Sequence, residues 1–312
     1  MYGRLWASPN RIRHETIFTA ALYGQVSRIV AFLDGKATWM IALLYIPTVK
    51  MVKGDEMKVA VITGSAQGIG RRTAEVLAEA GYALALLDVR SCEATLTAVR
   101  SAGADATEFV GDISDEGVVI RAARAVTKRW GGVDALVNNA GISFITPAET
   151  MEVADFRRVL EVNLVAPFLL AKQFGAMMLK QRSGSIVNVA SIAGLMGVSD
   201  RSAYNASKHG LIGLTRTLAA EWGGRGVRSN AVCPGWVKTE MDAADQARET
   251  YADSDITGRN PMGRFATPDD VARAIAFLAD PALSGFINGQ ALPVDGGWTM
   301  DGSWESLRMS KR

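Results

Sequence analysis

A tyrosine and a lysine stand one helical turn apart in the segment 202–208, which reads Ser-Ala-Tyr-Asn-Ala-Ser-Lys. Residues four apart share a face of a helix, so Tyr204 and Lys208 would be neighbours. A phenol has an ordinary pKa of about 10, and an ammonium about 5 Å away favours the phenolate by roughly 3 kcal/mol, or about two pKa units. The pair could therefore exchange a proton near neutral pH. The alternative is a packed tyrosine beside a lysine that reaches the solvent.

The elements that must position this pair alternate regularly after Met57. Short apolar runs predict buried parallel strands at 59–63, 83–88, 107–110, 135–138, 185–190, 227–232 and 291–294. Helical patterns lie between them, at 70–80, 93–102, 116–130, 155–181, 204–222 and 268–278. The alternation predicts an α/β fold: a single Rossmann-type, doubly wound parallel sheet of about seven strands, flanked by helices, with ligands beyond the carboxyl ends of the strands.

The chain divides near Met57. We expect an irregular N-terminal extension at 1–56, a Rossmann-fold catalytic domain at 57–300 and a C-terminal tail at 301–312. The extension is expected to be disordered, or absent from the native protein if translation starts at Met57 or Met51. Because it is rich in arginine and poor in acids, an organelle transit sequence is the alternative.

Composition and charge exclude several classes of protein. Hydrophobic residues make up 48% and charged residues 21% of the 312-residue chain, as in ordinary globular proteins. A net charge of +2 argues against nucleic acid as a partner. The apolar run at 37–49 is shorter than the roughly 20 residues of a membrane span. The distant Cys92 and Cys233 predict free thiols and a cytoplasmic location, and with only two histidines we expect no metal site.

A glycine-rich turn joins the first strand after Met57 to the following helix. Its sequence from residue 63 to 70 is Thr-Gly-Ser-Ala-Gln-Gly-Ile-Gly. Glycines allow a tight turn, a close approach of the backbone to a diphosphate, and close packing of helix on strand, while the helix N-terminus offers amide donors to phosphate. The alternative is a tight turn without a ligand. The turn predicts dinucleotide contacts at Gly64, Gln67, Gly68, Ile69 and Gly70.

The second strand of this domain ends at Asp88, near the offset of about 20 residues at which an acid reaches the adenosine ribose. A carboxylate there accepts hydrogen bonds from the 2′-hydroxyl and repels a 2′-phosphate, which favours NAD over NADP. Gln67 adds no positive charge to the turn, whereas Arg71, Arg72 and Arg90 lie nearby in sequence and favour NADP. The alternative role of Asp88 is a helix cap.

Three further segments complete a pattern: Asn138-Asn139-Ala140-Gly141 after the fourth strand, Ser191 after the fifth, and Asn163 in the long helix. Together with the glycine turn and Tyr204-x-x-x-Lys208, they make the chain resemble the short-chain dehydrogenase/reductase family from about residue 57 to 298. The segments 234–239 (Pro-Gly-Trp-Val-Lys-Thr) and 294–297 (Val-Asp-Gly-Gly) belong to the same pattern.

The resemblance implies roles for four residues. Tyr204 would be the general acid/base, which protonates a carbonyl oxygen in reduction and deprotonates an alcohol in oxidation. Lys208 would hold the nicotinamide ribose and lower the pKa of the tyrosine. Ser191 would bind the substrate oxygen, and Asn163 would help position a water-linked proton relay behind Lys208. Taken alone, Ser191 could be a cap serine and Asn163 a polar residue that bends its helix.

The same resemblance implies further cofactor contacts. Asp112 and Ile113 would border the adenine, and Asn139, Ala140 and Gly141 would line the dinucleotide groove. Val237 and Thr239 would meet the nicotinamide end. Asp112 has an alternative role, because the segment 112–115 also looks like the start of a helix with Ser114 as its cap.

The expected activity is hydride transfer between NAD(H) and a secondary alcohol or ketone, with a sugar, polyol or similar small hydroxy compound as substrate. An NADPH-dependent 3-oxoacyl-carrier-protein reductase and a nucleotide-binding scaffold or regulatory protein without turnover are the alternatives. A homo-oligomer, tetramer or dimer, is implied by the family and by the apolar helices. Acids in the segment 239–265 count against a strongly anionic substrate: Asp242, Asp245, Glu249, Asp253 and Asp255.

Overall fold

The structure is a computed structural model of the 312-residue chain. It describes residues 57–246, 252–304 and 307–308, apart from the side chains of 241, 244 and 245, and the backbone of three strands before Met57. The chain forms two compact units, residues 1–56 and 57–312.

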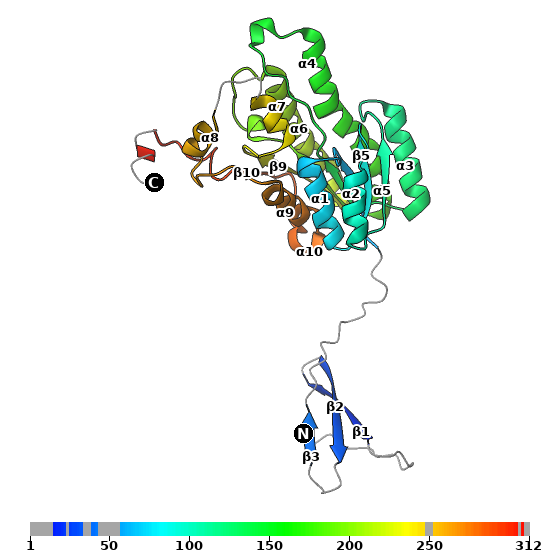
Figure 1. Cartoon of the computed structure of the whole chain (residues 1–312). Coiled ribbons are helices and arrows are strands. Elements are labelled where there is room, and N and C mark those ends of the chain that lie inside the picture. The colour runs from blue at the N-terminus through cyan, green and yellow to red at the C-terminus, as the bar shows by residue number, and fades with distance from the viewer. Residues whose placement is uncertain are drawn as a thin grey trace. The chain divides into compact units, whose positions relative to one another are not determined.

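The larger unit is built on a seven-stranded parallel sheet (Figure 1). Its strands are β4 (Val59–Thr63), β5 (Ala83–Asp88), β6 (Ala106–Val110), β7 (Ala135–Asn138), β8 (Gly184–Val189), β9 (Val227–Pro234) and β10 (Ala291–Val294). In space they run in the order β10-β9-β8-β7-β4-β5-β6, and all neighbours are parallel. The order reverses between β4 and β7, which confirms the predicted doubly wound Rossmann-type fold.

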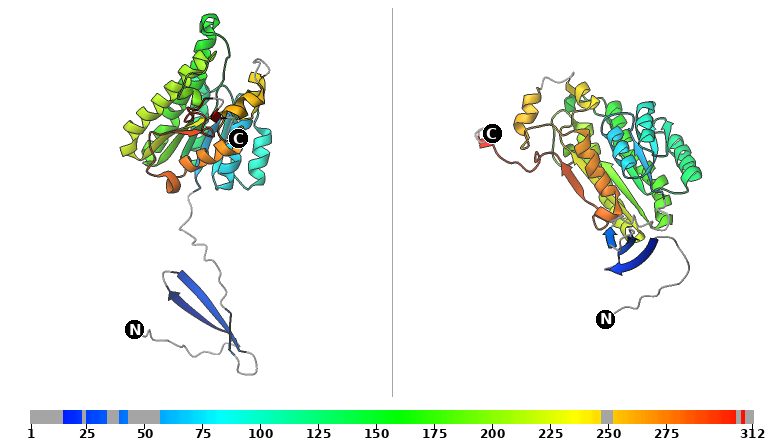
Figure 2. Two further views of the ribbon diagram at one scale, coloured as in Figure 1. Left: turned by 90° about the vertical axis from the view of Figure 1, so that its left-hand side faces the viewer. Right: turned by 60° about the horizontal axis from the view of Figure 1, so that its bottom comes forward.

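Helices cover both faces of this sheet (Figure 2). Helices α1 (Gly68–Glu79), α2 (Glu93–Ser101) and α9 (Pro268–Ala279) pack on one face. On the other face lie α3 (Glu116–Trp130), α5 (Ala166–Gln181) and α6 (Ser202–Trp222). Alternate residues of a strand enter the two cores: Ala60 and Ile62 the first, Val59 and Val61 the second. The continuous apolar runs of the sequence follow from this double burial.

The long helix expected at 155–181 is interrupted. It consists of α4 (Val153–Leu160), a π-helical turn η2 (Glu161–Val165) and α5. A π turn carries one more residue per hydrogen-bonded ring than an α-helix, and such turns are frequent at functional sites. The run Val153–Gln181 is long and apolar enough to cross a membrane by length and composition alone, but half of its most apolar window is buried inside the protein, as in a core helix.

Three short helices near the end of the chain were not predicted. They are α7 (Glu240–Gln246), α8 (Asp253–Arg259) and α10 (Pro281–Ser284). The first two are acidic and lack the apolar period of a helix that packs on a core, so their sequence resembles that of a loop. The helices α7 and α8 lie in the acid-rich segment 239–265.

The smaller unit contains three antiparallel strands, where the sequence predicts an irregular extension. Strand β2 (Gln25–Leu33) pairs with both β1 (Glu15–Leu22) and β3 (Trp39–Ala42). The prediction of a disordered or non-native extension remains a prediction, and Met51 lies outside the described residues.

Candidate active site

A cavity of about 480 Å³ lies beyond the carboxyl ends of the strands, where the strand order reverses. It gathers most of the residues that the sequence singles out, although they come from seven separate segments. Those on its wall are Gly64, Gln67, Gly68, Ile69, Asp88, Asp112, Ile113, Asn139, Ala140, Gly141, Ser191, Tyr204, Lys208, Val237 and Thr239. Gly70 and Asn163 are not part of the wall; both lie behind it.

The glycine turn has the geometry of a phosphate cradle. Gly64 and Gly68 have φ angles of +66° and +55°, in the left-handed region that favours glycine. A Cβ atom on Gly70 would collide with the carbonyl oxygen of Gly64, so Gly70 permits the helix to pack against the turn. At the start of α1, Gln67 makes no side-chain capping bond in the described structure, and Gln67, Gly68 and Ile69 line the cavity. These residues fit a dinucleotide diphosphate.

Thr63 joins this turn to the segment 139–141. Its hydroxyl accepts hydrogen bonds from the backbone amides of Asn139 and Ala140, both at 3.0 Å. The side-chain amide of Asn139 donates in return to the carbonyl oxygens of Thr63 (2.9 Å) and Gly64 (3.1 Å). The two loops that follow β4 and β7 are therefore held as one surface.

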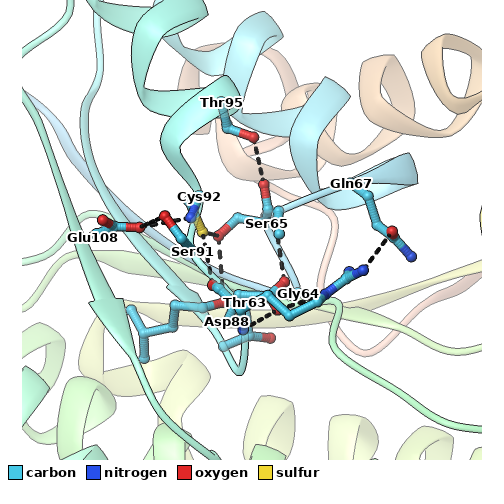
Figure 3. A network of polar contacts seen from close by, with 12 residues as sticks. Thr63, Gly64, Ser65, Gln67, Asp88, Ser91, Cys92, Thr95 and Glu108 are labelled. Carbon is cyan, nitrogen blue, oxygen red and sulfur yellow. Dashed lines mark hydrogen bonds and ion pairs between the residues drawn. The ribbon is translucent and has the colours of Figure 1, made fainter.

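Asp88 is fixed at the end of β5 by the protein backbone (Figure 3). One carboxylate oxygen accepts from the amide of Ala66 at 2.9 Å, and the other from the amide of Arg90 at 3.0 Å. The carboxylate caps these two loop amides and no helix. The exposed guanidinium of Arg90 donates to Gln67 Oε1 at 2.8 Å, with its Nε atom 3.7 Å from Asp88. The end of the cavity at which the sequence predicts the adenosine ribose thus carries a buried carboxylate and an exposed guanidinium.

At the other edge of this end, Asp112 is bound within the protein. Its carboxylate accepts from both the amide and the hydroxyl of Ser114, and from Arg158 at 2.6 Å. Helix α3 is capped by Asp115, whose side chain accepts from the amide of Gly117, so the alternative of Ser114 as the cap is wrong. Arg158, on α4, also lines the cavity and was not predicted. In the sequence, Arg158 is one of two adjacent arginines in an amphipathic helix, and nothing there distinguishes it from an ordinary surface arginine.

Tyr204 and Lys208 occupy one face of α6, as their spacing predicts. The Nζ atom of Lys208 lies 5.5 Å from the centre of the Tyr204 ring and donates to the carbonyl oxygen of Val189 at 2.8 Å. Burial lowers the pKa of Lys208 from its ordinary 10.5 to about 8. The lysine is therefore still largely protonated at neutral pH, with its charge beside the phenol.

Ser191 and Asn163 flank this pair on different sides. The hydroxyl of Ser191 caps the short turn Ile192–Gly194 by accepting a hydrogen bond from the amide of Ala193 at 3.1 Å. Ser191 also lines the cavity. Asn163, in the π turn η2, is completely buried and bonds both backbone groups of Ile142 at 2.9 Å. A Cβ atom on Gly141 would lie within 4 Å of both Asn163 Oδ1 and Lys208 Nζ, so the asparagine stands directly behind the lysine.

Lys238 joins the helices α7 and α8, which we call the cover helices because the start of α7 lines the cavity. The Nζ atom of Lys238 donates to Asp253 Oδ1 at 2.6 Å, at the start of α8, and lies 3.2 Å from Asp242 Oδ2, on α7. It also lies over the ring of Phe265, 4.3 Å from the ring centre. One lysine thus joins both cover helices to the loop that carries Val237 and Thr239.

Comparison with known proteins identifies the family. The sequence model of a family described as enoyl-(acyl carrier protein) reductase matches residues 64–299. The D-threitol dehydrogenase of Mycolicibacterium smegmatis is 39% identical over 245 residues, which are 78% of this chain and 93% of that protein. The chain belongs to the short-chain dehydrogenase/reductase family.

Two further relatives support the assignment. A 3-oxoacyl-[acyl-carrier-protein] reductase of Synechocystis sp. is 35% identical over 246 residues, 78% of this chain and 97% of that protein. A solved structure from Beutenbergia cavernae, named as an NAD(P)-dependent gluconate 5-dehydrogenase with NADP bound at low occupancy, is 41% identical, with a TM-score of 0.73 over 78% of this chain and 97% of that one. As a short-chain dehydrogenase/reductase, the protein is an oxidoreductase that acts on CH–OH groups with NAD(P).

At the substrate end, this dehydrogenase/reductase has two cavity residues that were given no polar role from the sequence. Arg201 immediately precedes α6 and is only 7% exposed. Its guanidinium lies 5.6 Å from the ring centre of Trp236, which also lines the cavity. The second cysteine of the chain, Cys233, is a buried free thiol whose pKa burial raises to about 11, so it is unsuited to act as a nucleophile at neutral pH.

Among the described residues, no group of three or more histidine, cysteine, aspartate or glutamate side chains could hold a metal ion.

Proposed function

We propose that the protein interconverts a secondary alcohol and a ketone with NAD(H), with Tyr204 as the general acid/base. One observation carries the proposal: Tyr204 and Lys208 face the same cavity as the glycine turn and Asp88, at the end that contains Ser191. The cavity therefore holds a place for a dinucleotide and, next to it, a group that can exchange a proton with a substrate oxygen.

The proposed catalytic residues divide the reaction into hydride transfer, proton transfer and positioning. The bound nicotinamide would supply or accept the hydride. The Ser191 hydroxyl would donate to the substrate oxygen, and the Tyr204 hydroxyl would give that oxygen its proton or remove it. The Lys208 ammonium favours the phenolate through its charge. Asn163 holds the backbone of Ile142 and so fixes the loop against which the lysine stands.

NAD is the proposed cofactor, because the Asp88 carboxylate is buried and both of its oxygens are held in place. A 2′-phosphate would meet a negative charge that cannot turn away. The Arg90 guanidinium favours NADP, and the relative from Beutenbergia cavernae contains NADP, so the choice depends on the balance of these two side chains.

A small hydroxy compound of the sugar or polyol kind is the proposed substrate, supported by the similarity to D-threitol dehydrogenase. An NADPH-dependent 3-oxoacyl-carrier-protein reductase is the second candidate, favoured by the similarity to the Synechocystis enzyme. A scaffold without turnover is disfavoured because all four residues of the proposed catalytic set are present and gathered. We further propose a cytoplasmic homo-oligomer, in which exposed apolar side chains such as Phe168 on α5 are covered by another copy.

The test is the Tyr204→Phe variant with Tyr82→Phe as its control. Tyr82 is a buried tyrosine whose hydroxyl has no hydrogen-bond partner in the described structure, so loss of that hydroxyl should change little. Initial rates are measured with NAD and NADP against polyols, sugars, hydroxysteroids and 3-oxoacyl thioesters. We expect Tyr204→Phe to lose at least about a thousandfold in kcat while NAD binding is retained. Full activity of this variant would refute the proposed role of Tyr204.

A further inference from the structure

Arg158 joins helix α4 to the loop after β6, at the end of the cavity where the family resemblance implies the adenine. Its Nη2 atom donates to Asp112 Oδ2 at 2.6 Å, and its Nη1 atom donates to Ser114 Oγ at 2.7 Å. Both Arg158 and Asp112 line the cavity. Their side chains are 45% and 39% exposed, and ion pairs as exposed as this one add little to stability. The position of the pair on the cavity wall therefore indicates a role in the site.

Protein donors occupy most of the acceptor positions of the Asp112 carboxylate. Its Oδ1 atom accepts from the backbone amide of Ser114 at 2.9 Å and from the hydroxyl of Ser114 at 2.7 Å, while Oδ2 accepts from Arg158. A carboxylate has about four acceptor positions, so, among the described residues, Oδ2 keeps one position without a protein donor. Because Asp112 lines the cavity, a bound ligand can supply this donor.

Arg158 and Ser114 fix both the orientation and the charge of the carboxylate. The Ser114 hydroxyl accepts from Arg158 and donates to Asp112 Oδ1, so the three side chains form a closed ring of hydrogen bonds. Partial burial raises the pKa of Asp112, but the hydrogen bonds from Ser114 and the guanidinium of Arg158 outweigh it and lower this pKa below its ordinary value. The carboxylate is therefore ionised at neutral pH and offers only acceptor positions to a ligand.

We infer that Arg158 is a positioning residue that holds Asp112 as the acceptor for the 6-amino group of adenine, and that it thereby sets the choice of base in the dinucleotide. The 6-amino group of adenine is a hydrogen-bond donor, whereas a 6-oxygen, as in hypoxanthine, is an acceptor. An oriented carboxylate binds the first and repels the second. The inference rests on the proposed function, since it concerns the cofactor of that same site.

Ser114 alone would not orient the remaining acceptor position. Without Arg158, the bonds to the carboxylate would hold only Oδ1, and Oδ2 could turn toward the solvent. The guanidinium is anchored on Ser114 Oγ by one nitrogen and holds Oδ2 with the other. An acceptor that is oriented in advance binds more tightly, because less side-chain entropy is lost on binding. Loss of Arg158 should therefore weaken recognition of the base more than binding of the rest of the dinucleotide.

The experiment measures the dissociation constants of NADH and of reduced nicotinamide hypoxanthine dinucleotide by calorimetric titration, so that no turnover is needed. A hydrogen bond to a charged group is worth about 10- to 100-fold in affinity, and we expect the wild type to prefer NADH by this factor. Arg158→Met should lower the preference at least about threefold, and Arg158→Lys, which keeps one cationic donor, should lower it less. The matched control is Arg157→Met, at an exposed neighbour outside the cavity wall, which should leave the preference unchanged.

The ratio of the two dissociation constants separates recognition of the base from support of the fold. An equal loss of affinity for both dinucleotides in Arg158→Met, or a wild-type ratio below about threefold, would overturn the inference while the proposed function would stand. Binding of neither NADH nor NADPH by the wild type would instead refute the dinucleotide site on which the proposed function depends. If Arg158→Met does not fold, Ser114→Ala decides, because it removes the hydroxyl that Arg158 and Asp112 share. The ratio should then fall, and an unchanged ratio would contradict the inference.

Discussion

Replacement of Asp88 by asparagine should change the preference between NAD and NADP. The side chain of Asp88 is only 6% exposed, and the amides of Ala66 and Arg90 hold its two oxygens, so the carboxylate cannot swing away from a 2′-phosphate. At about 6 Å and an effective dielectric constant of about 20, one pair of like charges costs roughly 3 kcal/mol. Since each 1.4 kcal/mol is a factor of ten, the Asp88→Asn variant should shift the ratio toward NADP by about 100-fold.

The readout is the ratio of kcat/KM for NAD to kcat/KM for NADP, measured at one ionic strength. Asparagine keeps the shape of aspartate but offers only one acceptor oxygen to the two amides, so the efficiency with both cofactors should fall through a looser glycine turn. The ratio removes this common loss. A ratio within about twofold of the wild-type value would show that Asp88 only holds the turn, and would refute the reasoning.

The matched control is Arg90→Gln. The side chain of Arg90 is 56% exposed and its Nε atom lies 3.7 Å from Asp88, so it offsets part of the repulsion. Its removal should shift the ratio toward NAD, opposite to Asp88→Asn, by up to about fivefold, because exposed charge pairs are worth at most about 1 kcal/mol. A shift in the same direction for both variants would mean that turn geometry, and not charge, sets the preference.

Three further predictions concern the frame of the site. Gly70→Ala should abolish NAD binding, measured by fluorescence titration, because the new Cβ would collide with a backbone carbonyl oxygen. The control is Gly213→Ala, at a position with open space on α6, which should keep NAD binding and add up to about 1 kcal/mol to the free energy of unfolding. Lys238→Met should raise the KM of the alcohol about three- to tenfold in steady-state assays, because the ion pairs that join Lys238 to the buried Asp242 and to the exposed Asp253 are lost. The pKa of Lys208 is lower in the folded protein than in the unfolded chain, so its buried charge destabilises the protein below about pH 8, and this cost disappears as the pH rises toward 10.5. Between pH 7.5 and 10, the wild type should therefore gain about 2 kcal/mol in free energy of unfolding relative to Lys208→Met; an unchanged difference in denaturant titrations would contradict the assignment.

The sequence was sufficient for the sheet and for much of the cavity wall. Buried parallel strands produce continuous apolar runs, and β4, β5, β7 and β10 have the predicted ends. The positions of Gly64 and Gly68 could also be predicted, because the tight turn after a strand requires left-handed backbone angles that favour glycine. The carboxyl ends of parallel strands meet at one edge, so local signals far apart in the chain could be combined into one site.

Other parts of the site depend on contacts that no local pattern encodes. Arg201 and Arg158 look like surface arginines in the sequence, and only the packing of α6 and α4 brings them to the cavity. The ion pairs of Lys238 involve Asp242 and Asp253, which lie in a segment whose sequence resembles that of a solvent-exposed loop. The strands at 15–42 were missed because their sequence lacks the regular alternation that follows Met57.

The π turn at Glu161–Val165 sets the rotational phase between the two halves of a 29-residue helix. Each residue of an α-helix advances by about 100°, so deletion of one residue in this turn would rotate α4 by roughly that angle relative to α5. The core contacts of Phe174 on α5 could survive such a deletion, but Arg158 on α4 would turn away from Asp112. At this point the length of the chain matters more than the identity of most of its residues. Single deletions here should therefore be tolerated far less than single substitutions.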